Sequence, residues 1–242
     1  MKEAPASTRA LVTGASSGIG REIALAFASA GVEVAVVGRS QAKLEALVAA
    51  AGQQGTRAKA YHLDLAAVTD IRAAVADIVA DFGGIDILVN SAGMGYTNPI
   101  AETSLADWQQ VFALNLTSVL QCIQGVLPTL RAQGGGTIVN VASIAAANPF
   151  PGWGAYSASK AALVSLTKTL AAEERDRGIR AIVVSPGAVN TPLWDTEAVR
   201  VELDRAAMLD PQVVATAIVQ AALLPANATI EELTITPSAG AL

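Results

Sequence analysis

Short runs of apolar, often β-branched residues alternate along the chain with longer, alanine-rich stretches in which apolar positions recur at helical spacing. The centres of several runs, such as 34–37, 87–89 and 182–184, are continuously apolar. Continuous apolar runs are typical of strands that are buried on both faces, as in a parallel sheet. The pattern predicts strands at 10–13, 33–37, 59–63, 85–90, 137–142, 180–185 and 231–235, and helices at 19–30, 41–51, 67–81, 105–130, 155–177 and 211–223.

Every interval between successive predicted strands is long enough for a helical crossover, which parallel neighbours require. The repeated alternation therefore predicts an α/β fold with a doubly wound, seven-stranded parallel sheet that is flanked by helices on both faces. No change of composition, repeat or linker divides the chain, so residues 1–242 are expected to form a single domain. Residues 1–8 are expected to be a flexible lead, and residues from about 190 to 210 a substrate loop.

The composition restricts the kind of protein. Apolar residues make up 52% and charged residues 15% of the 242 residues, and the net charge is −5. These values exclude an intrinsically disordered chain and disfavour a nucleic-acid-binding surface. Typical soluble domains carry about 25% charged residues, so either a membrane or a partner is expected to cover part of the surface. The long uncharged stretches 108–130 and 132–159 contain amides, glycines and prolines, so neither is predicted to be a lipid-facing helix.

The rarer residue types bear on location and on metal binding. The first residues include charges and no apolar run, so no signal peptide is expected. The single cysteine, Cys122, cannot form an internal disulfide and suits a reducing cytoplasm, which is the expected location. His62 is the single histidine, and no cysteine cluster accompanies it, so no metal site is expected.

A glycine-rich segment follows the first predicted strand and precedes the first predicted helix. Its glycines have the spacing G-x-x-x-G-x-G. Such glycines permit tight turns and let a pyrophosphate approach the backbone, while free N–H groups at the next helix N-terminus attract an anion. The segment predicts a dinucleotide site that is formed by Gly14, Ser16, Ser17, Gly18, Ile19 and Gly20.

The end of the second predicted strand indicates which dinucleotide is bound. A carboxylate there would bind the adenosine ribose of NAD, whereas an arginine accommodates the 2′-phosphate of NADP. The strand is followed by Gly38-Arg39-Ser40, without a carboxylate, so Arg39 predicts NADP(H). Asp64 could accept a hydrogen bond from the adenine amine or cap a helix. The remaining candidates beside the adenosine half are Leu65, Asn90, Ala92 and Gly93.

Further motifs follow in a fixed order. They are Asn90-Ser91-Ala92-Gly93, Asn115, Ser143, Tyr156-Ser157-Ala158-Ser159-Lys160 and Pro186-Gly187. In this order, and over nearly the whole chain, the sequence resembles the short-chain dehydrogenase/reductase family, in its NADP(H)-preferring, single-domain branch. The resemblance implies a Rossmann-type fold and an oxidoreductase that transfers a hydride between a nicotinamide and a carbonyl or alcohol carbon. Ser91 replaces the commoner second asparagine of the family's Asn-Asn-Ala-Gly.

The expected chemistry of the catalytic candidates follows from their types and spacing. Tyr156 and Lys160 are four residues apart and share one helix face. The ammonium is expected to lower the tyrosine pKa from about 10, so that Tyr156 can donate a proton to a carbonyl or accept one from an alcohol. Ser143 follows a predicted strand and can bond the substrate oxygen. By resemblance, Lys160 also holds the nicotinamide ribose, and Asn115 anchors a water that is linked to the lysine.

The loops after the later strands are expected to complete the site. By resemblance, the segment after the sixth strand binds the nicotinamide carboxamide through Pro186, Gly187, Val189 and Thr191. The expected substrate pocket comprises Met94, Tyr96, Ala145, Phe150, Trp153 and Trp194. Residues 144–155 carry no charge, and only Arg200 and Arg205 could anchor a carboxylate. The predicted substrate is therefore an uncharged ketone or aldehyde, or the matching secondary alcohol.

The sequence leaves other functions open. The C-terminal Pro237-Ser238-Ala239-Gly240 replaces the glycine pair that usually ends the 3-oxoacyl-carrier-protein reductases, and segments 224–226 and 232–237 resemble 3-hydroxy-acid and serine dehydrogenases. A 3-oxoacyl-thioester reductase and a 3-hydroxy-acid dehydrogenase are therefore the alternatives. A non-catalytic dinucleotide sensor is a third, although it would not need Ser143, Tyr156 and Lys160 intact.

The resemblance also suggests what covers the weakly charged surface. In the family, the two long helices that correspond to about 105–130 and 155–175 pack against their mates in a neighbouring subunit. A homotetramer or homodimer through these helices is therefore expected, whereas a nucleic acid or membrane partner is not.

Overall fold

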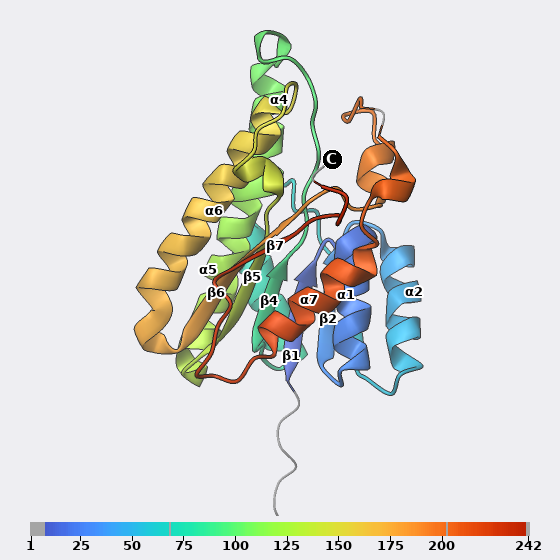
Figure 1. Ribbon diagram of the computed structural model, residues 1–242. Coiled ribbons are helices and arrows are strands. Elements are labelled where there is room, and N and C mark those ends of the chain that lie inside the picture. The colour runs from blue at the N-terminus through green and yellow to red at the C-terminus, as the bar shows by residue number, and fades with distance from the viewer. Residues whose placement is uncertain (1–7, 68, 202, 241–242) are drawn as a thin grey trace, which may run out of the picture.

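A single parallel sheet forms the centre of the computed structural model, which describes residues 8–67, 69–201 and 203–240 (Figure 1). The strand order is β3-β2-β1-β4-β5-β6-β7, and every neighbouring pair is parallel. The strands are β1 (Arg9–Thr13), β2 (Glu33–Gly38), β3 (Ala58–His62), β4 (Ile87–Asn90), β5 (Gly136–Val141), β6 (Ile179–Pro186) and β7 (Glu232–Ile235). The predicted doubly wound α/β fold is confirmed. Of residues 1–8, which the sequence predicts to be a flexible N-terminal segment, only residue 8 belongs to the described residues.

Helices cover both faces of the sheet. Helices α1, α2 and α7 pack against one face, and α3, α5 and α6 pack against the other. The bounds are α1 (Gly18–Ser29), α2 (Gln41–Gly52), α3 (Ile71–Phe82), α4 (Leu105–Phe112), α5 (Ser118–Gln133), α6 (Gly154–Glu174) and α7 (Pro211–Ala222).

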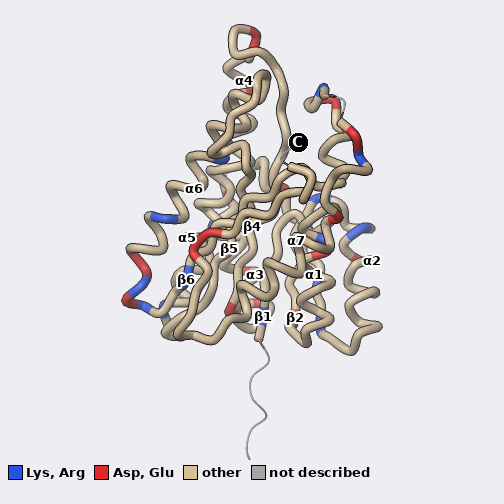
Figure 2. The backbone as a smooth tube through the Cα atoms, in the orientation of Figure 1, with Lys and Arg blue, Asp and Glu red and all other residues tan. Residues whose placement is uncertain are grey.

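Side chains of the central strands alternate between the two layers. Val12 and Val36 join the core under α1, α2 and α7, whereas Leu11 and Val37 join the core under α3, α5 and α6. Because both faces are covered, both sets of alternate positions must be apolar. This explains why the strands read as continuous apolar runs and contribute few charges (Figure 2).

Two helix predictions need correction. The helix predicted at 105–130 is interrupted by a π-helical turn, Ala113–Thr117, and continues to Gln133. The helix predicted from residue 67 begins at Ile71, because Asp64 first forms a turn in which its carboxylate accepts a hydrogen bond from the amide of Ala66 at 2.9 Å. Asp64 therefore does not cap this helix.

By length and composition alone, the helical stretch Leu105–Gln133 could cross a membrane. In this fold it packs against α3 so closely that a Cβ on Gly125 would lie 2.8 Å from Val75 Cβ. Its apolar character therefore belongs, at least in part, to the core of the protein.

The sheet places all candidate site segments at one edge. Thr13, Asn90 and Asn140 lie side by side in register at the carboxyl ends of β1, β4 and β5. The chain reverses its order of strands between β1 and β4, and such switch points are where open α/β sheets bind ligands.

Candidate active site

The glycine-rich segment brings three parts of the chain into close contact. A Cβ on Gly14 would lie 2.8 Å from the backbone of Ala92, and one on Gly18 would lie 3.2 Å from Thr191 Cβ. Both glycines have positive φ values, 68° and 54°, which favour glycine. The turn after β1 therefore meets the loops after β4 and β6 as the sequence predicts.

The N-terminus of α1 opens beside these contacts. Ser17 precedes the helix without a capping side-chain hydrogen bond, and the first turn has no acidic residue. Its N–H groups are therefore available to an anion such as a pyrophosphate. Nearby, the buried Oδ1 of Asn90 has no hydrogen-bond partner among the described residues, although its Nδ2 donates to Asn140 at 2.8 Å. The cradle of glycine contacts and the open helix end fit a dinucleotide.

The other adenosine-side candidates lie around the end of β2. Arg39 is exposed and, within the part of the chain that the structure describes, forms no hydrogen bond or ion pair. Ser16 lies directly against Gly38, where any side chain would collide with its hydroxyl. Asp64 is exposed, whereas Leu65 is buried in the core on the α3 side.

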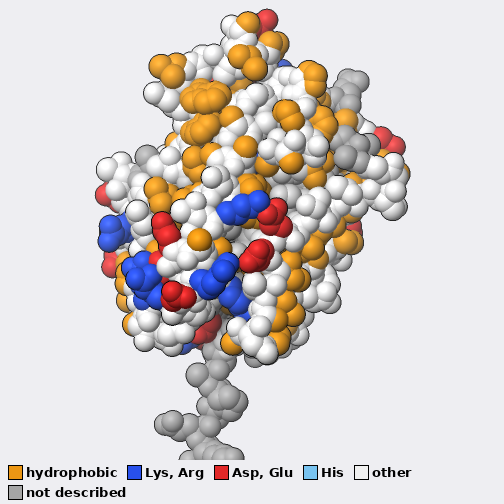
Figure 3. Space-filling view, turned by 60° about the vertical axis from the view of Figure 1, so that its left-hand side comes forward, with side chains coloured by type: hydrophobic (Ala, Val, Ile, Leu, Met, Phe, Trp, Pro, Cys, Tyr) orange, Lys and Arg blue, Asp and Glu red, His pale blue; other side chains and the backbone are white. Residues whose placement is uncertain are grey.

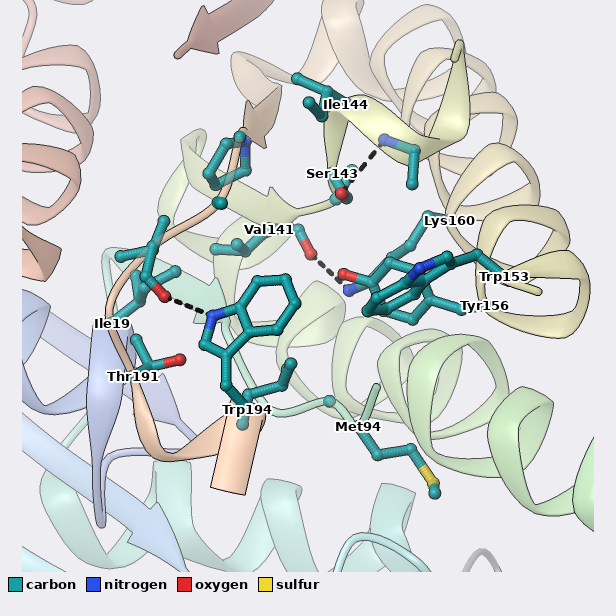
Figure 4. A pocket seen from close by; sticks show the side chains of 18 of the residues that line it. Ile19, Met94, Val141, Ser143, Ile144, Trp153, Tyr156, Lys160, Thr191 and Trp194 are labelled. Carbon is teal, nitrogen blue, oxygen red and sulfur yellow. Dashed lines mark hydrogen bonds between the residues drawn. The ribbon is translucent and has the colours of Figure 1, made fainter. Parts of the chain in front are cut away.

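The catalytic candidates converge on the carboxyl end of β5 (Figure 4). Ser143 follows β5, and its Oγ accepts a hydrogen bond from the amide of Ala145 at 3.1 Å. Tyr156 lies in the first turn of α6 and interacts through its hydroxyl with Ser143. Lys160, one turn further along, is only 5% exposed, and its Nζ donates to the carbonyl of Val141 at 2.8 Å.

Asn115 lies in the π-helical turn and is fully buried. Its Oδ1 accepts from the amide of Met94 at 2.8 Å, and its Nδ2 donates to the carbonyl of Met94 at 3.0 Å and to Ser159 Oγ at 3.1 Å. The turn thus ties the loop after β4 to α6. A Cβ on Gly93 would lie 3.2 Å from Asn115 Oδ1 and 3.5 Å from Lys160 Nζ, so the backbone of Gly93 passes close to both side chains.

The electrostatics of the pair differ from the sequence expectation. Burial raises the pKa of Tyr156, and the interaction with Ser143 offsets this only in part. Lys160 Nζ donates to the carbonyl of Val141 and lies 5.8 Å from the tyrosine ring centroid. Burial also lowers the pKa of Lys160 to about 8. In this structure Tyr156 is therefore a neutral phenol at neutral pH.

A cavity of about 220 Å³ extends from the catalytic side chains toward the loop after β6. Most predicted residues of the nicotinamide and substrate ends line it. The lining includes Ile19, Gly93, Met94, Ser143, Ala145, Phe150, Trp153, Tyr156, Lys160, Pro186, Gly187, Val189, Thr191 and Trp194. The other predicted cofactor residues, among them Gly14, Ser17, Gly20, Arg39 and Ala92, lie outside it along the sheet edge. Asn115 does not line the cavity either.

Tyr96, which the sequence suggests for the substrate pocket, does not line this cavity. It is buried against Val111 and Ala155, and its hydroxyl donates to Asp107 Oδ2 at 3.1 Å. The sequence analysis missed Val201 and Leu203, which do line the cavity. Their only signal is that they are apolar residues within the loop that the sequence suggests for the substrate.

Neither arginine of the substrate loop reaches the cavity lining. Arg205 donates to Asn190 Oδ1 at 2.9 Å and to the carbonyl of Thr191 at 3.0 Å. Arg200 donates from Nε to the carbonyl of Glu197 at 3.3 Å. The described residues contain no cluster of three or more metal-binding side chains.

The sequence model of the family "short chain dehydrogenase" matches residues 8–200. The chain belongs to the short-chain dehydrogenase family. A D-threitol dehydrogenase from Mycolicibacterium smegmatis is 42% identical to this short-chain dehydrogenase over 190 residues, which are 77% of this chain and 73% of that protein. A 3-oxoacyl-[acyl-carrier-protein] reductase from Staphylococcus epidermidis is 40% identical over 181 residues, 74% of each chain.

Solved structures agree with this family. The L-sorbose reductase from Gluconobacter frateurii, complexed with NADPH and L-sorbose, superposes with a TM-score of 0.87 at 30% identity and covers 100% of this chain and 99% of its own. The short-chain dehydrogenase described here is therefore an oxidoreductase that acts on alcohol or carbonyl groups.

The lowered pKa of Lys160 makes a prediction about stability. A lysine in the unfolded chain has a pKa of about 10.4, so between about pH 8 and pH 10 the unfolded chain binds more protons at this residue than the folded one. The free energy of unfolding must then rise with pH in this range. We expect the wild-type protein to gain stability relative to Lys160→Met between about pH 7 and 9.5, in denaturant titrations at each pH. A stability difference that does not change with pH would contradict the burial of an ammonium here.

Proposed function

We propose that the protein is an NADP(H)-dependent oxidoreductase that interconverts an uncharged ketone or aldehyde and its alcohol, with Tyr156 as the general acid and base. The observation that carries this is the convergence of Tyr156, Ser143 and Lys160 at one end of a largely apolar cavity. In this proposal, residues 1–242 form one cofactor-binding and catalytic domain, and the protein works in the cytoplasm.

The choice of NADP(H) rests on the surroundings of β2. Arg39 is an exposed guanidinium at the strand end that pairs with none of the described residues, and a guanidinium suits a phosphate. The glycine contacts and the α1 N-terminus would hold the pyrophosphate, and the loop from Pro186 to Thr191 the nicotinamide. When bound, NADP(H) supplies or takes the hydride. The similar L-sorbose reductase is complexed with NADPH.

The side chains divide the remaining work. In reduction, the neutral Tyr156 hydroxyl donates a proton to the carbonyl oxygen, which the Ser143 hydroxyl also orients. The raised pKa of Tyr156 keeps that proton in place at neutral pH. Lys160 places a positive charge beside the tyrosinate that forms, and Asn115 fixes the loop behind the lysine. In oxidation the proton moves the other way.

A 3-oxoacyl thioester is the second candidate substrate, because a 3-oxoacyl-[acyl-carrier-protein] reductase is 40% identical to this chain. A 3-hydroxy acid is less favoured. Lys160 is the single charged side chain among the described residues that line the cavity, and Arg205 is occupied by Asn190 and Thr191.

Removal of one hydroxyl tests the catalytic role. Tyr156→Phe should lower kcat for ketone reduction by about 10²–10⁴-fold, which is the usual contribution of general acid catalysis, while the Kd for NADPH stays within a factor of about two. Tyr96→Phe is the matched control, because its hydroxyl bonds Asp107 away from the cavity, and it should keep full activity. Full ketone reduction by Tyr156→Phe would refute the mechanism.

A second substitution tests the cofactor. Arg39→Ala should raise the KM for NADPH by about 10–100-fold, since a hydrogen bond to a charged group contributes about 1.5–3 kcal/mol. The KM for NADH, which has no 2′-phosphate, should change little. Equal changes for both cofactors would remove Arg39 from the cofactor site.

We also propose that the protein is a homotetramer or homodimer that associates through the α4–α5 and α6 helices. Large apolar side chains are exposed on α4 and α5 and on the turn before α4, with Ile100 81%, Leu105 70%, Trp108 39% and Leu120 38% exposed. Ile100, Leu105 and Trp108 line one groove together with Ala155 of α6. Figure 3 shows hydrophobic side chains gathered toward the α4 end of this side of the molecule and charged ones below them. Exposed apolar patches of this kind mark protein interfaces.

Sedimentation velocity tests this association. The unaltered protein should sediment as a dimer or tetramer at micromolar concentration, and Leu105→Lys should shift it toward smaller species because a lysine would have to be buried in the interface. Ala49→Lys, on the exposed side of α2, is the control and should sediment as the wild type does. A stable wild-type monomer would overturn the proposal.

A further inference from the structure

Three aromatic rings follow one another at the substrate end of the cavity (Figure 4). Trp153 meets Tyr156 edge to face, with ring centroids 5.2 Å apart, and meets Trp194 in the same way at 5.8 Å. Trp153 immediately precedes α6, whereas Trp194 comes from the loop after β6. Two distant parts of the chain thus present indole rings to the space beside the reacting hydroxyl.

The position of Trp194 is fixed by hydrogen bonds. Its Nε1 donates to the carbonyl of Val189 at 2.8 Å. Arg205, further along the chain, holds the same loop. It donates to Asn190 and Thr191 and forms an ion pair with Asp195 at 3.3 Å.

A second contact holds the far side of the same loop. The amide of Thr97 donates to the carbonyl of Ala198 at 2.8 Å, and the amide of Arg200 donates to Thr97 Oγ1 at 2.7 Å. A Cβ on Gly95 would lie 2.6 Å from Val199 Cγ2, so the loop lies tightly on this segment. The aromatic wall is therefore in place before a ligand arrives, which lowers the entropic cost of binding.

The rest of this end of the cavity offers few polar partners. Its other walls are formed by Met94, Ile144, Phe150, Leu193, Val201 and Leu203. A polyhydroxylated ligand would lose water from hydroxyls that find few acceptors among the described residues of this end, and each unsatisfied buried group costs about 1–3 kcal/mol. A flat apolar group loses nothing of this kind and can pack edge to face with both indoles.

We infer that the substrate is an aryl ketone, a carbonyl compound with an aromatic ring on the carbonyl carbon, and that Trp153 and Trp194 hold that ring. This inference rests on the proposed function. Hydride adds to the carbonyl carbon, the Tyr156 proton goes to the oxygen, and the product is the benzylic alcohol. The inferred substrate differs from those named for two similar proteins, which are a polyol for D-threitol dehydrogenase and a ketose for L-sorbose reductase.

Binding of the product alcohol provides a readout that needs no turnover. Isothermal titration calorimetry with NADPH present should give a Kd for 1-phenylethanol that Trp194→Ala weakens about tenfold, which is 1.4 kcal/mol and within the range of aromatic contacts. Trp194→Phe should restore most of the affinity. Tyr61→Ala is the matched control, because Tyr61 is an aromatic residue on β3 that does not line the cavity.

Kinetics then complete the test. Wild-type kcat/KM should be higher for acetophenone than for L-sorbose, and Trp194→Ala should lower the acetophenone value more strongly than the L-sorbose value. Faster turnover of L-sorbose or D-threitol, or a Kd for 1-phenylethanol that Trp194→Ala leaves unchanged, would overturn the aryl-ketone inference and leave the proposed oxidoreductase intact. Lack of turnover for every carbonyl compound tried with either nicotinamide cofactor would instead refute the proposed function.

Discussion

The parallel pairing of the strands is the constraint on which the rest of this structure depends. Parallel neighbours must be joined by crossovers, and the crossover helices bury both faces of the sheet. All strands then end at the same edge, where Thr13, Asn90 and Asn140 lie in register. The loops that follow these strands meet for that reason, and the cavity lies among them.

Much of the fold could be read from the sequence, because a strand buried on both faces leaves an unambiguous apolar run. All seven strands lie within two residues of their predicted bounds. The π-helical turn at Ala113–Thr117 could not be predicted in this way, since no glycine or proline between residues 105 and 124 marks a break in the helix. The start of α3 depends on the turn at Asp64, whose carboxylate bonds to Ala66 rather than to the helix.

The candidate site was predictable where it consists of an ordered motif, and not where it depends on the path of the chain. Ser143, Tyr156 and Lys160 meet as their spacing suggests. The direction of the Tyr156 pKa shift was not predictable, because it depends on how deeply the folded chain buries the hydroxyl. Val201 and Leu203 line the cavity only because long-range contacts of Arg205 and Thr97 fold the loop back over it.

The helix that carries Tyr156 is attached to the protein differently from its neighbour α3. All buried residues of α3 are apolar, whereas those of α6 include Ser157, Ser159, Lys160, Thr167 and Glu174. Apolar packing tolerates side chains of about the right volume and therefore positions a helix only approximately. Hydrogen bonds are directional and position it more accurately. Thr167 accepts from Asn140 at 2.8 Å, and Lys160 donates to Val141 at 2.8 Å, so two bonds set α6 against β5. The same strand leads to Ser143, so β5 positions both Ser143 and the helix that carries Tyr156 and Lys160.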